Sequence, residues 1–192
     1  MSNLTVEKLR ELLEVQREFD SRIEGRNKKD TSAALIVEFV EWINTVEFFK
    51  NWKKKKGKEY KMQLSELADM LAFTLSKLLQ NGDDEEAILK SISEMVNDYL
   101  YDRDEESHVH FNSMNFLMYL HMMTGTMIEE VEEDAEDVDD TFASRLIIVY
   151  MLPFLISLEY YSIEELEESY KHKMGINHDR QDGKADKDKG YK

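Results

Sequence analysis

The sequence of 192 residues contains no cysteine, one proline and seven glycines. The absence of cysteine excludes a disulfide framework, a thiol nucleophile and a thiolate metal site. Few residues favour turns, and Leu, Glu, Lys, Met and Ala recur with a period near that of an α-helix, so the chain is predicted to be almost wholly helical. We therefore expect an all-α fold, a multi-helix bundle, in which any bound metal has oxygen ligands.

Long hydrophobic runs are also missing. The longest nearly apolar run, Leu146 to Leu158, contains Pro153 and is shorter than the roughly 20 residues that span a bilayer, so it predicts a buried, kinked core helix. The N-terminus does not resemble a signal segment, and we expect a cytoplasmic protein without membrane contact. The net charge of −16 disfavours binding to nucleic-acid backbones.

Seven helices are predicted from the hydrophobic periodicity, with Asp30 or Thr31 as the cap of the second. They cover approximately Leu4 to Ile23, Ser32 to Lys50, Met62 to Leu79, Asp84 to Tyr101, Phe111 to Glu130, Phe142 to Leu158 and Ile163 to Lys173. The length suits one domain, which we assign to residues 1–174. Past Gly175 the chain loses apolar residues, so composition alone predicts a disordered tail over residues 175–192.

Two carboxylate pairs lie inside apolar helical runs: Glu38 with Glu41, and Glu66 with Asp69. The i, i+3 spacing puts both side chains of a pair on one helix face. Two such helices packed antiparallel would bring four acids together, and cations must then neutralise them because unpaired buried charges are costly. Oxygen ligands favour Mg²⁺, with Mn²⁺ as a substitute, and Mg²⁺ indicates a phosphate-bearing substrate.

The acid pairs also have a less specific interpretation. A single E-x-x-E pair in an acidic helical protein is more often a solvated stripe or part of structural ion pairs. Two pairs on consecutive helices, both in apolar surroundings, favour a metal site. The sequence contains no Gly-rich phosphate loop, H-E-x-x-H or G-x-S-x-G motif that would indicate a different catalytic centre.

The E-x-x-E and E-x-x-D pairs resemble the signature of the all-α NTP pyrophosphatase (MazG-like) superfamily. The spacer after the first pair is similar to that of its dimeric dUTPase branch, and contains Asn44, Glu47, Phe49, Lys50 and Trp52. This resemblance implies a Mg²⁺-dependent homodimeric enzyme that converts dUTP and water to dUMP and pyrophosphate, with dUDP as a further candidate substrate. The four acids would be both its metal ligands and its catalytic residues.

The C-terminal segment carries a second resemblance. Lys173-x-x-x-Asn177-x-x-Arg180-Gln181, followed later by Gly190-Tyr191, is similar to the terminal phosphate-binding motif of that branch. The resemblance implies that Lys173, Asn177, Arg180 and Tyr191 bind the substrate. Charge-assisted hydrogen bonds from the Lys and Arg side chains would hold the phosphates. In this chain an Asp- and Lys-rich segment separates Gln181 from Gly190, where the family has a shorter connection.

Residues for the nucleoside are implied by the same resemblance. Gln16 and Asp20 match a first-helix motif that faces the nucleoside, and Lys50 with Trp52 would adjoin the base. Taken alone, a Gln on an apolar helix face is more often a satisfied core group, and a Trp at a helix end is usually packing.

Two alternative functions stay open. The same chemistry on dCTP or another dNTP is one, because contacts to metal and phosphates do not distinguish bases. The other is a non-enzymatic acidic DNA mimic or inhibitor, which needs its acids on an exposed surface. A run of methionines at helical spacing predicts either core or dimer interface, and comprises Met114, Met118, Met122, Met123 and Met127.

Overall fold

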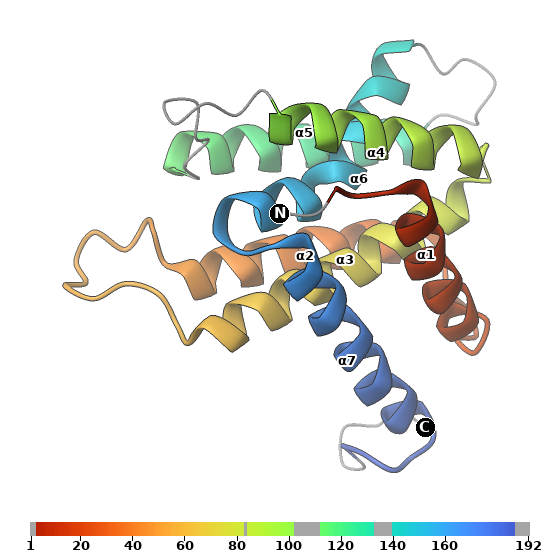
Figure 1. Cartoon of the computed structure of the whole chain (residues 1–192), viewed down its shortest axis with the longest axis horizontal. Coiled ribbons are helices and arrows are strands. Elements are labelled where there is room, and N and C mark those ends of the chain that lie inside the picture. Colours follow the sequence, from red (N-terminus) through yellow and green to blue (C-terminus); the bar gives the residue numbers. More distant parts are fainter. Residues whose placement is uncertain (1–2, 83, 102–111, 133–139, 187–192) are drawn as a thin grey trace.

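A computed structural model describes residues 3–82, 84–101, 112–132 and 140–186, and within these ranges the chain forms seven helices and no strand (Figure 1). The helices are α1 (Val6–Asp20), α2 (Lys28–Val46), α3 (Tyr60–Asn81), α4 (Glu85–Tyr101), α5 (Ser113–Glu132), α6 (Asp140–Tyr160) and α7 (Ile163–Gln181). The predicted all-α multi-helix architecture is confirmed.

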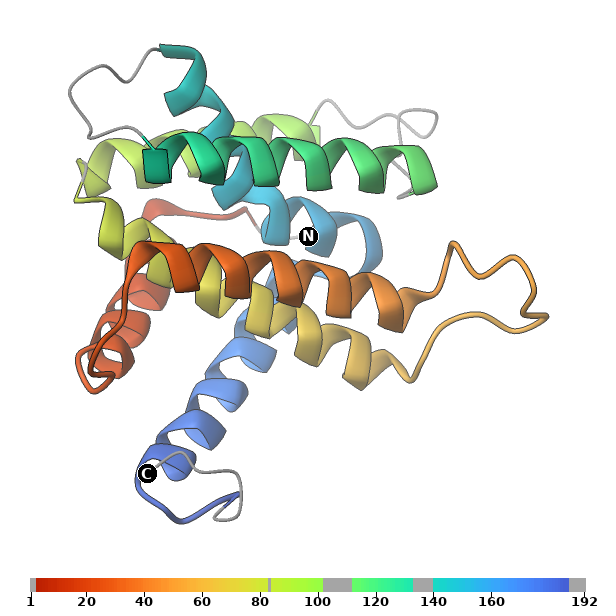
Figure 2. The same cartoon turned by 180° about the vertical axis from the view of Figure 1, so that it is seen from behind.

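Helix α3 is the centre of the bundle and packs against α1, α2, α6 and α7. Its apolar residues Leu67, Leu71 and Leu75 are buried in the same core as Phe39 and Trp42 of α2. Helices α4, α5 and α6 lie on one side of the α2–α3 pair, and α7 extends away on the other side (Figures 1 and 2). This arrangement leaves α2, α3 and α7 to form one region around the acid pairs.

The limits of α2 differ from the prediction at both ends. The helix begins at Lys28, because Asn27 and not Asp30 is the N-cap: the Asn27 side chain accepts a hydrogen bond from the backbone N–H of Asp30. It ends at Val46, because Glu47 adopts a left-handed conformation with φ 60°. The buried Glu47 carboxylate then binds the loop that follows, including Lys50 and the backbone N–H of Gly57.

Helix α7 is longer than predicted. It continues past Lys173 and Gly175 to Gln181, so the first part of the expected disordered tail is helical. The backbone N–H of Asp182 closes the helix by donating to carbonyls of its last turn, and the Asp182 carboxylate forms an ion pair with Arg22. Composition did not indicate this extension, because a stabilising contact comes from Arg22, which follows α1 and is distant in the sequence.

Two further predictions concern apolar segments. Among the described helices, one segment, Thr141–Tyr160 of α6, is long and apolar enough to cross a membrane, but 61% of its most apolar window is buried, as in the core helix of many proteins. Pro153 lies inside this helix. The methionines of α5 divide between the predicted environments: Met123 is buried, whereas Met118 is 62% exposed.

Candidate active site

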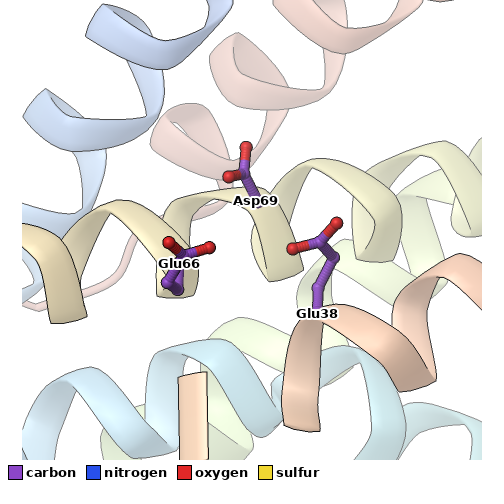
Figure 3. A group of neighbouring side chains, drawn as sticks. All are labelled: Glu38, Glu66 and Asp69. Atoms are coloured by element: carbon purple, nitrogen blue, oxygen red, sulfur yellow. The ribbon is translucent and has the colours of Figure 1, made fainter. Parts of the chain in front are cut away.

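Three carboxylates from α2 and α3 meet in space. Ligand oxygens of Glu38, Glu66 and Asp69 all lie within 4.8 Å of one another, and all three residues are half-buried. Figure 3 shows Glu38 reaching from α2 toward Glu66 and Asp69 on α3. The two helices are antiparallel, because side chains near the end of α3 bond to the start of α2: Lys77 donates to Ser32. The predicted convergence of the pairs therefore occurs for these three acids, which we call the acid cluster.

Glu41, the fourth predicted acid, stands at the edge of the acid cluster. It is exposed and is not one of the three carboxylates that lie within 4.8 Å. Its charge nevertheless raises the pKa values of the other three acids, so it lies close enough to interact with them. The sequence places Glu41 inside an apolar helical run, but the α2 face with Val37, Val40 and Glu41 is open to solvent.

The acid cluster is electrostatically unfavourable without a cation. Burial, followed by the negative charges of Asp69, Glu41 and Glu66, raises the pKa of Glu38 to about 7. Burial also raises the pKa of Glu66 and of Asp69, and the positive charge of Lys173 opposes both shifts. Closely spaced carboxylate oxygens that resist ionisation are the donor set that divalent cations such as Mg²⁺ bind. The residues present fit such an ion.

Helix α7 brings the predicted phosphate-binding residues to this cluster. Lys173 Nζ lies 2.6 Å from Asp69 Oδ2. Asn177 and Arg180 follow at i+4 and i+7, which puts all three on one helix face, and Arg180 donates to Asn177 Oδ1 at 3.0 Å. The positive charge of Arg180, like that of Lys173, opposes the rise that burial causes in the pKa of Asp69. The structure therefore pairs Lys173 with the acid cluster, whereas Arg180 forms its ion pair with Asp186. Tyr191 lies outside the described residues.

Gln16 and Asp20 form a buried polar network between α1 and α7. Gln16 Nε2 donates to Asp20 Oδ1 at 2.8 Å, and the Tyr170 hydroxyl donates to Gln16 Oε1 at 3.0 Å. Asp20 is also paired with Arg26, which reaches Ser76 on α3. Sequence reasoning did not identify Tyr170 or Arg26. The packing of α7 on α1 shows the role of Tyr170, and the loop between α1 and α2 brings Arg26 to Asp20. Gln16 and Asp20 are thus satisfied by neighbours within the chain, as the less specific interpretation of Gln16 predicted.

Lys50 and Trp52 lie elsewhere. They belong to the loop between α2 and α3, which Figures 1 and 2 place at the opposite end of the molecule from α1. Lys50 Nζ contacts Asn44 Oδ1 at 2.8 Å and Glu47 Oε1 at 3.0 Å, whereas Trp52 is 75% exposed. Within one chain these two residues therefore do not adjoin Gln16 and Asp20.

Comparison with known proteins identifies the family of this helical acid site. Among curated proteins, none matches the chain significantly. A family model described as dUTPase matches residues 8–184, a range that contains the whole acid cluster and α7. The chain therefore belongs to the all-α dUTPase family, which hydrolyses dUTP to dUMP and pyrophosphate.

Proposed function

We propose that this dUTPase depends on Mg²⁺, with Mn²⁺ as a substitute, and that Glu38, Glu41, Glu66 and Asp69 hold the metal. The observation that carries the proposal is the close approach of three half-buried carboxylates from two helices. Their raised pKa values indicate mutual repulsion and burial, so a bound divalent cation gains more electrostatic free energy here than at scattered surface acids. When bound, divalent ions polarise phosphoryl oxygens and make water more acidic, which assists displacement at phosphorus.

The side chains of the chain itself would bind and orient the triphosphate. Lys173 and Arg180 supply cationic donors on the α7 face that adjoins the acid cluster, and Asn177 between them adds an amide. Charge-assisted hydrogen bonds from this face would hold the phosphates against α3 and α2. A carboxylate of the four acids would accept the proton that the attacking water loses. Tyr191 would add to the phosphate contacts from the C-terminal end.

The nucleoside would be bound near the network of Gln16 and Asp20. Because both side chains are buried and paired, they fix the shape of the adjoining surface as well as offering polar atoms to a base. Lys50 and Trp52 belong to the loop between α2 and α3, which lies at the other end of the molecule from α1 (Figures 1 and 2). In a homodimer, the loop of the second copy can supply them.

A homodimer is supported by unpartnered apolar side chains on α2 and α5, two helices that pack together. Each of these side chains is at least 41% exposed: Val37, Val40, Met114, Leu117, Met118 and Ile128. A patch of this kind is typical of an interface between copies of a chain. We also expect the enzyme to act in the cytoplasm, where nucleotides are its substrates.

A nucleotide panel tests the proposal. The purified chain would be incubated with dUTP, dUDP, dCTP and the other dNTPs, each with Mg²⁺ or with EDTA, and the released product identified as pyrophosphate or orthophosphate. We expect pyrophosphate from dUTP with Mg²⁺ and no product with EDTA. Equal turnover in EDTA would refute the metal dependence, and faster turnover of dCTP would refute the preference for uracil. A DNA mimic is disfavoured because three of the four acids are half-buried.

A further inference from the structure

Lys173 occupies the position at which a cation is needed. Its ammonium lies 2.6 Å from Asp69 Oδ2, and the two side chains are only 16% and 20% exposed. Among the described residues it is the one Lys or Arg that forms an ion pair with a member of the acid cluster. The residue expected to bind substrate phosphate is therefore held by a residue expected to bind metal.

The backbone around Lys173 is anchored. One turn earlier on α7, the Ser169 hydroxyl donates to the Leu64 carbonyl of α3, and the Tyr170 hydroxyl donates to Gln16 Oε1 on α1. Any change of partner by Lys173 must therefore come from its side chain, whose long flexible stem and three donor hydrogens permit such a change.

Space for that movement exists beside the ion pair. A cavity of about 530 Å³ between α3 and α7 is lined by Lys173 itself and by Ser65, His172 and the carboxylates Glu165 and Glu168. Lys173 thus stands at a boundary between the acid cluster on one side and an open cavity on the other. Its ammonium can leave Asp69 without unfolding the end of α7.

We propose that Lys173 is the resident counter-ion of the acid cluster, which holds Asp69 in the nucleotide-free protein and moves to the phosphates when a nucleotide binds. This inference rests on the proposed metal site and assigns Lys173 a second partner there. Two cations at Asp69 repel each other, so the ammonium weakens divalent cation binding as long as it stays. Departure of Lys173 toward phosphate removes that repulsion, and coupling between two binding events is reciprocal. Metal and nucleotide would therefore strengthen each other's binding through one side chain.

Calorimetric titration of Mn²⁺ or Mg²⁺ into the full chain without nucleotide tests this. We expect Lys173→Met to bind the cation about tenfold more tightly than the unchanged protein. A close opposite charge shifts the binding equilibrium of a carboxylate by about tenfold or more. Lys173→Arg keeps the positive charge and should stay near the unchanged affinity. Lys171→Met is the matched control, since it removes the same charge from an exposed position on the same helix.

A second measurement guards against a folding defect in the variant. Without Lys173 the acid cluster has lost its counter-ion, so Lys173→Met should unfold at a lower temperature than the unchanged protein in EDTA and gain more from added Mg²⁺. Equal cation affinity in the unchanged protein and in Lys173→Met, or weaker binding in the variant, would overturn the counter-ion role alone. No cation binding by any of the variants would overturn the proposed metal site as well.

Discussion

The hydroxyl of Tyr170 on α7 donates a 3.0 Å hydrogen bond to Oε1 of Gln16 on α1, across 154 positions of sequence. Both residues are buried, and burial raises the pKa of Tyr170 well above its usual range, so the phenol stays a donor at all working pH values. This contact ties the helix that carries Lys173 to the helix that carries the proposed nucleoside residues.

Replacing Tyr170 tests the importance of that tie. Tyr170→Phe leaves Gln16 Oε1 without its donor in a buried place, so we expect the free energy of unfolding in urea to fall by about 1–2 kcal/mol. We also expect a higher KM for dUTP, since Gln16 is free to turn. Tyr101→Phe removes a phenol whose bonds to Asn3 are exposed, and it should change neither quantity measurably. An unchanged free energy of unfolding for Tyr170→Phe would show that the hydrogen bond between Tyr170 and Gln16 does not stabilise the folded chain.

The acid cluster predicts a large effect from a small substitution. Glu38→Gln keeps the side-chain volume but removes one proposed metal ligand, so we expect kcat/KM for dUTP to fall at least about 100-fold. Steady-state pyrophosphate release measures this, and Glu11→Gln on the exposed surface of α1 is the control. Activity of Glu38→Gln within a few-fold of the unchanged enzyme would mean that Glu38 is not a ligand.

The acid site could largely be anticipated because helix periodicity fixes which side chains share a face. The i, i+3 spacing of Glu66 and Asp69 predicted one face of α3, and two consecutive helices predicted that Glu38 would meet them, as the structure has it. The C-terminal motif likewise predicted that Lys173 would lie near the metal and phosphate site, and it contacts Asp69. The expectation for the acids depends on local spacing in two consecutive helices, whereas the expectation for Lys173 depends on the resemblance of its motif.

The remaining features depend on long-range packing, which spacing does not reveal. Tyr170 looked ordinary in the sequence, and only the packing of α7 against α1 makes it a partner of Gln16. Arg26 likewise becomes the partner of Asp20 only through the path of the loop between α1 and α2. Similarly, the apolar residues around Glu41 did not indicate that one face of α2 is exposed, because burial depends on which helices pack against it. The buried Glu47 was also unexpected among so many lysines.

Glu47 provides a pH-dependent test of the loop between α2 and α3. Hydrogen bonds from Lys53 and then from Lys50 lower the pKa of Glu47 to about 2. A depressed pKa in the folded state contributes stability that is fully present above the unfolded value of about 4.5 and is lost as pH falls toward 2. Urea unfolding should therefore show a stability advantage over Glu47→Gln that is constant above about pH 5 and shrinks below it. An advantage that grows on acidification would contradict the ion-pair assignment.

The apolar face of α2 and α5 predicts the oligomeric state. If it joins two copies, Leu117→Glu combined with Met118→Glu should give a particle of 22.7 kDa in light scattering, whereas the unchanged chain should have twice that mass. Met95→Glu on α4, where the side chain is 41% exposed outside this face, should remain dimeric. A monomeric unchanged chain would refute the homodimer, and with it the supply of Trp52 from a second copy.

The stability of the metal-free protein should depend on pH through Glu38. Its pKa is raised to about 7 in the folded state, chiefly by burial, so between the unfolded value and pH 7 the folded chain holds the proton more strongly than the unfolded chain. Stability contributed by that proton is present at low pH and is lost as pH rises through about 7. In EDTA, the free energy of unfolding of the unchanged chain should therefore fall relative to Glu38→Gln between about pH 5 and pH 8. Added Mg²⁺ should abolish the difference in slope, since a bound cation stabilises the ionised carboxylate. A relative stability that stays level in EDTA, or that rises with pH, would mean that Glu38 ionises freely and that the acid cluster is not strained.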